Sequence, residues 1–417
     1  MHIIEEAQHL IEEGQTEKGL ELLESYESEA NDDEKFTMAL LYHQLGLLNQ
    51  AEKLFSELWS KYPNEGELML YLADIYVDQE KDEEAIELLS QLNQEDDFYV
   101  QSLIQLADLY QSQGLFEVAE QKLLEAKKQL PTEPLIDFAL GELLFASGEY
   151  LKAIPYYEKA LKTNTHFNDV DITHRLAEAL ALTGKWEEAL EYFQNSSNLD
   201  NPDVLFRYGF TAYQSERSDI AINMWEQLIE LDPSYSSVYF LLAQAYEEEG
   251  MLEKAYETAQ KGLKEDELNK ELFYFAGQVA NQLGKQTEAF SHLQEAIAID
   301  LGYKEAVISL IDLYKKLEEY EQIKDLVEEL NREGEGDPLY QWELARANYE
   351  LEEFDLALNN YHEAYNAFTS DADFLKEYGY FLVEEGRMDE AYQVLSKYMT
   401  IEPSDTEVEE FLLRLNQ

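Results

Sequence analysis

The residues with the best claim to metal chemistry form one local cluster: His166, Asp169, Asp171 and His174. Imidazole nitrogens and carboxylate oxygens are common ligands of divalent metals. The spacing of the four residues fits no standard metal-binding loop. A polar turn followed by a helix cap explains the same residue types. We prefer that interpretation and expect no metal site.

Other motifs that carry chemistry are missing from the sequence. It contains no G-x-x-x-x-G-K-[ST] phosphate loop, no H-E-x-x-H zinc motif and no G-x-S-x-G nucleophile elbow. Cysteine is absent, which removes disulfides, thiolate metal sites and cysteine nucleophiles. Acidic pairs such as Asp96 and Asp97 are expected to be solvated faces of helices. We therefore expect a protein that is not an enzyme and that has no catalytic residues, cofactor or metal.

The charge of the chain argues against two classes of partner. Its 417 residues include 89 acidic and 30 basic side chains, a formal charge of −59. Nucleic acid is not expected as a partner because lysine and arginine must release the counterions of the phosphates. Anionic membrane surfaces are disfavoured for the same reason. No window approaches the roughly 18 apolar residues of a membrane span, so direct membrane insertion is not expected either.

The N-terminal residues indicate where the protein acts. The stretch MHIIEEAQHLIEEG has acids where a secretory signal would have lysine or arginine, and it has no apolar core segment. This composition favours a cytoplasmic protein. The acidic, cysteine-free composition also suits a bacterial origin.

The helices that must position any functional residue can be predicted from a repeat in the sequence. Residues 100–133 show the unit of this repeat. Leu106, Ala107 and Tyr110 predict a first helix, and Gly114 predicts a turn. Ala119, Leu123 and Ala126 predict a second helix, which Pro131 ends. One residue after each turn marks the period: Ala51, Ala85, Ala119, Ala153, Ala189, Ala221, Ala255, Ala289, Ile323, Ala357 and Ala391. Neighbours in this series are 34 residues apart, except for the intervals of 36 and 32 on either side of Ala189. Because so small a helix pair cannot bury its apolar face alone, each pair must pack on the next.

The period and its fixed residues resemble the tetratricopeptide repeat (TPR) family over essentially the whole chain. The resemblance implies an all-α fold, an α-α superhelical solenoid of about twelve helix-turn-helix repeats. It also implies a protein that binds other proteins or peptides.

The repeat divides the chain into four regions. We expect repeats 1–10 in residues 1–333, with a shift of phase near residues 164–202, where an insertion precedes a compensating deletion. We expect a glycine hinge at residues 334–337 and repeats 11 and 12 in residues 338–403. Residues 404–417 should form a C-terminal capping helix, with Ser404 as its N-cap.

In the first helix of each repeat, the residue directly after the small one (Ala107 in residues 100–133) forms a row across successive repeats, and four of these residues in succession are carboxylates. The row consists of Asp74, Asp108, Glu142, Glu178, Phe210, Gln244, Gln278, Asp312, Arg346 and Tyr380. In TPR proteins this position faces the concave groove and contacts bound peptides, so the resemblance implies the same placement here. Aromatic residues occupy groove-type positions of the same helices: Phe138, Phe145, Phe206, Tyr213, Phe240, Tyr274, Trp342 and Tyr349.

We therefore expect the groove to bind a protein or peptide segment that carries basic and apolar residues. Carboxylates would attract lysine or arginine, and the rings would supply contact area. An alternative is that the row reflects only a glutamate-rich composition and that several of the rings pack between repeats. Charge reversal at Asp108 and Glu142 would distinguish the two. TPR proteins that bind chaperones hold a terminal carboxylate with lysine, arginine and asparagine, and the acidic and aromatic residues here argue against that ligand.

Two functions fit these observations. The first is a non-enzymatic scaffold or adaptor that recruits partner proteins, as the resemblance most often implies. The alternative is a peptide-sensing regulator of the TPR pheromone-receptor type. Those relatives carry an N-terminal effector domain, whereas the repeat here starts with the first residues, which favours the adaptor. The sequence leaves the oligomeric state open.

Overall fold

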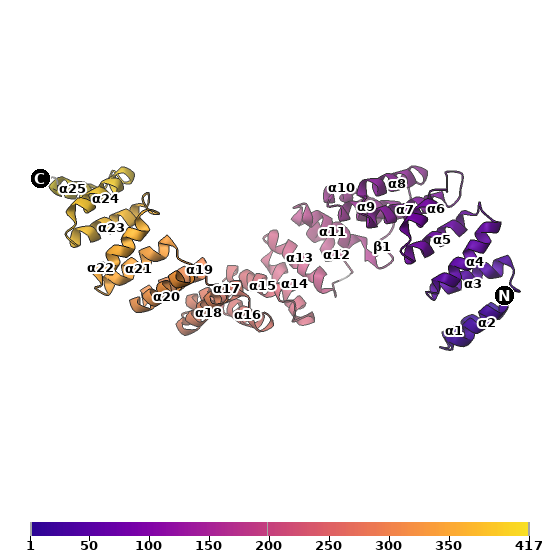
Figure 1. The fold of residues 1–417 in the computed structure, drawn as a ribbon, viewed down its shortest axis with the longest axis horizontal. Coiled ribbons are helices and arrows are strands. Elements are labelled where there is room, and N and C mark those ends of the chain that lie inside the picture. The colour runs from indigo at the N-terminus through magenta and orange to yellow at the C-terminus, as the bar shows by residue number, and fades with distance from the viewer. Residues whose placement is uncertain (1, 198, 416–417) are drawn as a thin grey trace. The chain divides into compact units, whose positions relative to one another are not determined.

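The computed structural model describes residues 2–197 and 199–415 (Figure 1). These residues form 25 α-helices and one two-stranded hairpin. The helices belong to two compact units, Met1–Arg217 and Ser218–Gln417. The prediction of an all-α solenoid of about twelve TPR repeats is confirmed, since the helices succeed one another as the 34-residue period requires.

The N-terminal unit contains the first thirteen helices and both strands. Their bounds are α1 His2–Glu12, α2 Thr16–Tyr26, α3 Asp32–Gln44, α4 Leu48–Lys61, α5 Gly66–Asp78, α6 Asp82–Leu89, α7 Tyr99–Ser112, α8 Phe116–Gln129, α9 Pro134–Ala146, α10 Tyr150–Leu161, β1 His166–Phe167, β2 Val170–Asp171, α11 Ile172–Leu182, α12 Trp186–Asn195 and α13 Pro202–Gln214.

The C-terminal unit contains the remaining twelve helices of the described chain. Their bounds are α14 Ser218–Leu231, α15 Ser237–Glu248, α16 Leu252–Glu265, α17 Lys270–Gln282, α18 Gln286–Ile299, α19 Lys304–Lys316, α20 Tyr320–Glu333, α21 Pro338–Glu350, α22 Phe354–Tyr365, α23 Ala372–Glu384, α24 Met388–Ile401 and α25 Thr406–Leu415.

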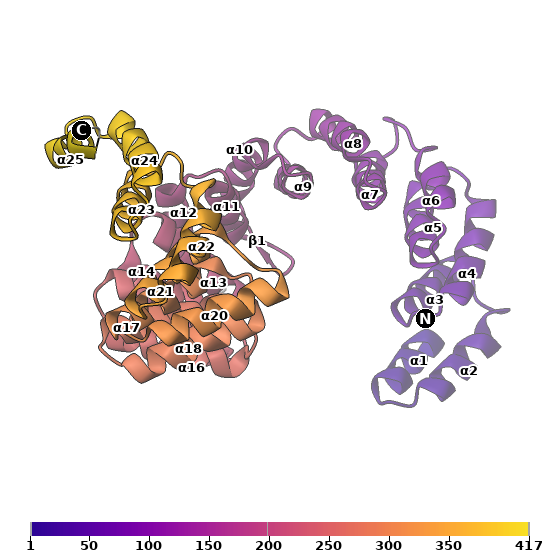
Figure 2. The same cartoon turned by 60° about the vertical axis from the view of Figure 1, so that its left-hand side comes forward.

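The pair of α7 and α8 shares its core with the next helix along the chain, α9. Ala107 on α7 and Ala119 on α8 are buried, and such small side chains let two helix axes approach closely. The same apolar cluster includes Ile136 and Leu140 of α9, so the next repeat covers this pair. Figure 2 shows α7 and α8 side by side, as are α5 and α6. Contacts between neighbours of this kind stabilise a repeat protein.

The turn between the two helices of a repeat needs a residue in the left-handed conformation. Gly114 has a φ of 74° there. In four other turns a glutamate adopts this conformation, with φ between 58° and 61°: Glu80, Glu216, Glu318 and Glu352. A residue with a Cβ is strained by roughly 1 kcal/mol or more in this conformation. These four turns are therefore less stable than the glycine turns.

The connection after α10 contains a short hairpin that the sequence did not predict. β1 and β2 pair antiparallel, with His166 opposite Asp171. The Asp171 carboxylate caps α11, because it accepts hydrogen bonds from the backbone N–H groups of Thr173 at 2.8 Å and His174 at 3.4 Å. It also accepts a hydrogen bond from the backbone N–H of Ser197 at 3.0 Å, which ties the hairpin to the end of α12. The Nε2 atom of His166 lies 3.1 Å from the Ser197 hydroxyl. The interpretation of this segment as a polar turn with a helix cap is confirmed.

Residues 334–337 end one helix and start the next. Gly334 ends α20 in the left-handed conformation, with a φ of 87°. Asp337 caps α21 by accepting a hydrogen bond from the backbone N–H of Leu339 at 2.8 Å. Helices α20 and α21 also contact each other. A hinge at these residues stays a prediction.

The last helix, α25, covers the end of the C-terminal unit. Val408 is fully buried, and Phe411 packs against the same core cluster. The predicted capping helix is therefore confirmed. The prediction that Ser404 caps it was wrong, because Asp405 accepts the hydrogen bond from the backbone N–H of Val408 at 3.2 Å. Residues 1, 198, 416 and 417 of the predicted regions lie outside the described residues.

Replacing Ala119 by leucine should destabilise the protein by about 1–3 kcal/mol, because the added carbons have no space between α7 and α8. Urea unfolding followed by circular dichroism measures this change. Ala146 is exposed at the end of α9, so Ala146→Leu is the matched control and should shift the unfolding free energy by less than about 0.5 kcal/mol. Equal unfolding curves for both variants would contradict the close helix contact.

Substitutions at two turns should change stability in opposite directions. Glu80→Gly should stabilise the protein by about 1 kcal/mol, since glycine removes the strain of the left-handed backbone. Gly114→Ala should destabilise it by a similar amount, and a Cβ added at Gly114 would meet no atom within 4 Å, so only the backbone conformation contributes. Chemical unfolding of both variants would test this pair, and a shift of the same sign in both would refute it.

Candidate functional site

The predicted site residues all lie on the first helix of a pair. They are Asp74 on α5, Asp108 on α7, Phe138, Glu142 and Phe145 on α9, Glu178 on α11, Phe206, Phe210 and Tyr213 on α13, Phe240 and Gln244 on α15, Tyr274 and Gln278 on α17, and Trp342 and Tyr349 on α21. The structure divides them into separate groups with different surroundings. Some lie in pockets, and others pack within the repeats.

Most row carboxylates contact a partner on the next first helix. The partner always stands two residues before the small residue of that helix, so in regular repeats the two residues are 31 apart in the chain. The pairs in the N-terminal unit are Gln105 with Asp74 at 2.7 Å, Arg175 with Glu142 at 3.2 Å, and Arg207 with Glu178 at 2.8 Å. In the C-terminal unit the same two positions carry the reverse charges, with Glu377 and Arg346 at 2.6 Å. Sequence reasoning missed these pairs, although the 31-residue spacing could have revealed them.

Glu178 is the most deeply buried carboxylate of the row, with 4% of its surface exposed. It forms ion pairs with Arg207 and with Arg175, the latter at 3.1 Å. Burial alone would raise the pKa of Glu178, but the hydrogen bond to His174 and the charges of the two arginines outweigh burial and lower it. Glu142 is engaged as well, since it also accepts a hydrogen bond from the Tyr157 hydroxyl at 2.6 Å. Both glutamates therefore hold repeats together.

Asp108 differs from its neighbours because Ala139 occupies its partner position. Within residues 2–197 and 199–415, neither Asp108 nor Asp74 forms an ion pair with a basic residue, and the charge of His43 offsets only part of the effect of burial on the pKa of Asp74. Asp108 is exposed, so a ligand can reach it. The pocket walls still displace enough water to raise the pKa of both carboxyl groups.

Asp74 and Asp108 lie in one pocket of about 220 Å³ formed by α5, α6 and α7. Asp82 adds a third carboxylate, and Val77 and Leu109 add apolar walls. We call it the acidic pocket. The carboxylates of the acidic pocket have no ion-pair partner, and they lie beside apolar side chains. The pocket therefore suits a ligand with a cationic end and an aliphatic stem.

The rings of α13 line a smaller pocket in the same unit, of about 140 Å³. Phe206 and Phe210 stack with their centroids 6.4 Å apart, and Phe210 is 37% exposed. Leu182 and Trp186 complete an apolar wall. This apolar pocket could hold an apolar side chain of a partner.

Other predicted groove residues contact side chains of neighbouring elements, and of these Trp342 is buried whereas Phe138, Phe145, Phe240 and Tyr274 are half-buried. Trp342 is buried, and its ring centroid lies 5.1 Å from that of Phe374. The Phe138 ring lies 5.0 Å from Phe167 of β1, and Phe145 lies under the guanidinium of Arg175. Further ring contacts join Phe240 to Phe275 at 5.6 Å and Tyr274 to Tyr303 at 5.3 Å. These contacts agree with the alternative of packing between repeats for Trp342, and a groove role for the half-buried rings stays a prediction.

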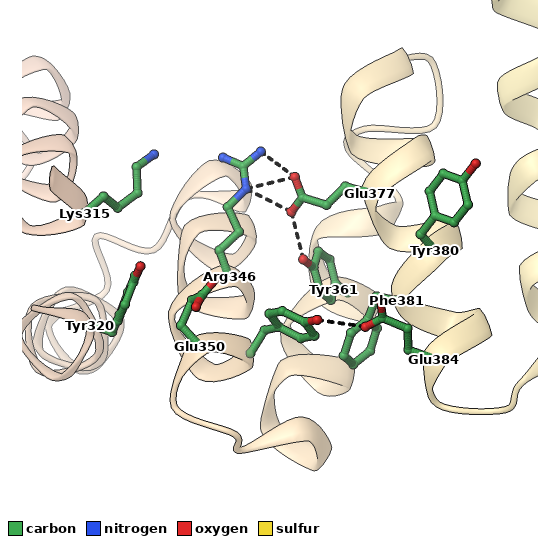
Figure 3. Close-up of a pocket in the computed structure, with 10 residues that line it drawn as sticks. Lys315, Tyr320, Arg346, Glu350, Tyr361, Glu377, Tyr380, Phe381 and Glu384 are labelled. Atoms are coloured by element: carbon green, nitrogen blue, oxygen red, sulfur yellow. Dashed lines mark hydrogen bonds and ion pairs between the residues drawn. The ribbon is translucent and has the colours of Figure 1, made fainter. Parts of the chain in front are cut away.

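A pocket of about 420 Å³ lies within the C-terminal unit, between α19 and α23 (Figure 3). We call it the tyrosine pocket. Its base is the pair of Arg346 and Glu377, and Glu377 also accepts a hydrogen bond from the Tyr361 hydroxyl at 2.8 Å. Tyr349 donates a hydrogen bond to Glu384 at 2.8 Å. Sequence reasoning chose Tyr349 as a site residue here and placed Arg346 and Tyr380 in the row, but it missed the other residues of the lining.

The described parts of the chain contain no group of three or more histidine, aspartate or glutamate side chains that could hold a metal ion. None of the described helices combines the length and the apolar character that crossing a membrane requires.

Models of tetratricopeptide repeat families match several stretches of the chain. The YpiA-like tetratricopeptide repeats match residues 111–165, and the YpiA-like C-terminal tetratricopeptide repeats match residues 338–405. General tetratricopeptide repeat families match residues 42–105, 144–208 and 224–257.

Individual proteins are similar over different lengths. The TPR repeat-containing protein YpiA of Bacillus subtilis (strain 168) is 43% identical over 415 residues, which cover 99% of this chain and 98% of that protein. DnaJ homolog subfamily C member 3 of Gallus gallus is 26% identical over 255 residues, 53% of this chain and 50% of that protein. The solved structure of YrrB, a TPR protein with an unusual peptide-binding site, matches 45% of this chain and 96% of its own at 19% identity and a TM-score of 0.40. The identity to YpiA over almost the full length of both proteins shows that the chain belongs to the YpiA-like family of tetratricopeptide repeat proteins.

Proposed function

We propose that this chain is a non-enzymatic adaptor that binds a partner protein through a segment carrying basic and apolar side chains. TPR repeat proteins generally serve as scaffolds for protein interactions and are typically non-catalytic. The observation that carries the finer proposal is the acidic pocket of Asp74 and Asp108.

The first argument concerns the state of the two carboxylates. Desolvation raises the pKa of Asp74 and Asp108, so their charged forms are destabilised in the folded protein. A protein gains no stability from such groups at neutral pH. A bound ammonium or guanidinium group would supply the missing positive charge and lower both pKa values.

The second argument concerns the shape of the ligand. Val77 and Leu109 line the acidic pocket next to the carboxylates. The aliphatic stem of a lysine or arginine can pack on these side chains while its charged end meets the carboxylates. The apolar pocket of Phe206 and Phe210 lies in the same unit and suits an apolar side chain of the same partner.

The third argument concerns the rate of association. With 89 acidic residues against 30 basic ones, the chain attracts positively charged segments over long distances. Such steering raises association rates and falls steeply with ionic strength. The net charge alone would act on any basic segment, so selectivity must come from the pockets.

Removing the charge of the acidic pocket should weaken peptide binding. The probes are a labelled ten-residue peptide of alternating lysine and leucine and its glutamate-leucine counterpart, followed by fluorescence anisotropy at 50 and 300 mM salt. The variant Asp74→Asn/Asp108→Asn should bind the lysine peptide at least about fivefold more weakly, a loss of about 1 kcal/mol. The control Glu87→Gln/Glu117→Gln removes two exposed charges from α6 and α8 and should change affinity less than about twofold.

An equal loss of affinity for the lysine peptide in both double variants would mean that only net charge matters, and the pocket proposal would fail. Glu142 is unsuitable for this test, because its pair with Arg175 makes any reversal a structural change. Pull-down at two salt concentrations separates the two functions. A basic protein released by salt supports the adaptor, whereas a short peptide retained at high salt supports the peptide-sensing regulator.

Neutralising Asp108 and neutralising Glu178 should change the stability of the protein in opposite directions. The pKa of Asp108 is raised in the folded state, so its contribution to stability is present below its unfolded pKa of about 4 and is lost as pH rises through the folded value. Asp108→Asn should therefore be more stable than the unmodified protein at pH 7, with a smaller difference at pH 4. The pKa of Glu178 is lowered, so its contribution is present at pH 7 and is lost on acidification. Glu178→Gln should destabilise the protein by about 1–3 kcal/mol at pH 7 because it removes the buried charge that pairs with Arg175 and Arg207.

Urea unfolding of both variants at pH 4 and pH 7 measures these differences. Destabilisation by Asp108→Asn at pH 7 would show that Asp108 has a structural role and would contradict its assignment to ligand binding.

A further inference from the structure

We propose that the tyrosine pocket of the C-terminal unit binds the guanidinium group of an arginine on a partner segment. The inference extends the proposed adaptor function to a second site with its own chemistry. It depends on the rings, the unpaired carboxylates and the rigid base of the pocket.

The walls of the pocket are aromatic. Tyr320 of α20, Tyr349 of α21, and Tyr380 and Phe381 of α23 line it. Figure 3 shows Tyr320 and Tyr380 on opposite sides, with the pair of Arg346 and Glu377 between them. The face of an aromatic ring carries partial negative charge and attracts cations, with larger energies where water is excluded.

The charges around the pocket leave room for one more cation. Lys315 pairs with Asp312 and Glu343, and Arg346 pairs with Glu343 and Glu377. These two cations are therefore already matched by three carboxylates. An anionic ligand would have to displace them.

Two further carboxylates of the lining, Glu350 and Glu384, have no basic partner among the residues that the structure describes. Glu384 only accepts the hydrogen bond of the Tyr349 hydroxyl. Both glutamates are exposed, so a ligand can reach them. Five carboxylates thus surround two cations, and the excess negative charge favours a positively charged ligand.

The base of the pocket is organised before any ligand arrives. Arg346 binds both oxygens of Glu377, with its Nε atom 2.9 and 3.0 Å from them. The same carboxylate accepts hydrogen bonds from Trp342 at 2.9 Å and Tyr361 at 2.8 Å. These contacts join α21, α22 and α23, so the base of the pocket needs little reorganisation when a ligand binds.

Arginine fits this pocket better than lysine for a geometric reason. Its planar guanidinium can stack on a ring while it donates paired hydrogen bonds to a carboxylate at its edge. The chain itself contains this arrangement, since Arg346 lies 4.2 Å from the ring centroid of Trp342 and pairs with Glu377. A lysine ammonium can make the charge contact but cannot stack in this way.

Isothermal titration calorimetry of the full chain at 150 mM salt tests the assignment. The probes are three acetylated, amidated tripeptides, Gly-Arg-Gly, Gly-Lys-Gly and Gly-citrulline-Gly. The arginine peptide should bind at least about tenfold more tightly than the citrulline peptide, which has the same shape without the charge, and measurably more tightly than the lysine peptide. Tyr320→Leu and Glu350→Gln should each weaken arginine binding at least about fivefold.

Three control variants should retain arginine binding within about twofold. Tyr320→Phe keeps the ring and separates the role of the ring from any loss of folding. Glu385→Gln removes an exposed charge next to Glu384 that does not line the pocket. Asp74→Asn/Asp108→Asn leaves the tyrosine pocket intact, so it separates this site from the acidic pocket.

Several results would overturn the assignment. They are an absence of measurable arginine binding, equal binding of the citrulline or lysine peptide, and unchanged binding in Tyr320→Leu and Glu350→Gln. Loss of binding in Asp74→Asn/Asp108→Asn alone would place the arginine in the acidic pocket instead. Because that double variant and the lysine-leucine peptide test the adaptor proposal separately, the two proposals can fail independently.

Discussion

The close contact between neighbouring helix pairs is the constraint on which the other features depend. A pair as short as α7 and α8 has too little apolar surface to be stable alone, and Ala107 and Ala119 let its helices approach until their apolar faces are covered. The next first helix then lies near enough for side chains on successive first helices to meet. The 2.7 Å hydrogen bond from Gln105 to Asp74 is one result of this spacing.

That spacing divides the carboxylate row into two kinds of residue. Where the partner position holds an arginine, as with Arg175 and Arg207, the carboxylate is neutralised and holds two repeats together. Where the position holds Ala139, the carboxylate of Asp108 has no positive partner, and burial raises its pKa because it destabilises the charged form. A carboxylate whose charged form is destabilised in the folded protein is a good candidate for ligand binding. The charge-reversed pair of Arg346 and Glu377 shows that the two positions, and not a particular order of charges, make the link.

Sequence reasoning recovered the features that depend on local pattern. The period of the small residues predicted the repeat and the pairing of helices, and the pattern of residues 404–417 predicted the capping helix, because these follow from which side chains can be buried. The hairpin of β1 and β2 was missed, since two-residue strands leave no periodic signal. Ser404 was preferred over Asp405 as a cap because both residue types are good caps and only the backbone geometry decides.

The candidate site was predicted less completely, for a physical reason. A ring such as Trp342 has the same helical spacing whether it faces a partner or the core, so burial had to come from the structure. The row was located correctly on the first helices, but the arginines that neutralise Glu142 and Glu178 stand one repeat further along the chain. Their role depends on packing between repeats, which a single repeat does not reveal.

The central claim is that the residue at the partner position decides whether a row carboxylate joins repeats or binds a ligand. The most direct measurement supplies the missing partner in the variant Ala139→Arg and determines both its urea stability at pH 7 and its affinity for the lysine-leucine peptide. The account predicts a more stable protein that binds the peptide at least about fivefold more weakly, because the new arginine forms an ion pair with Asp108 and blocks its contact with the peptide. A variant with unchanged stability and unchanged peptide affinity would contradict it.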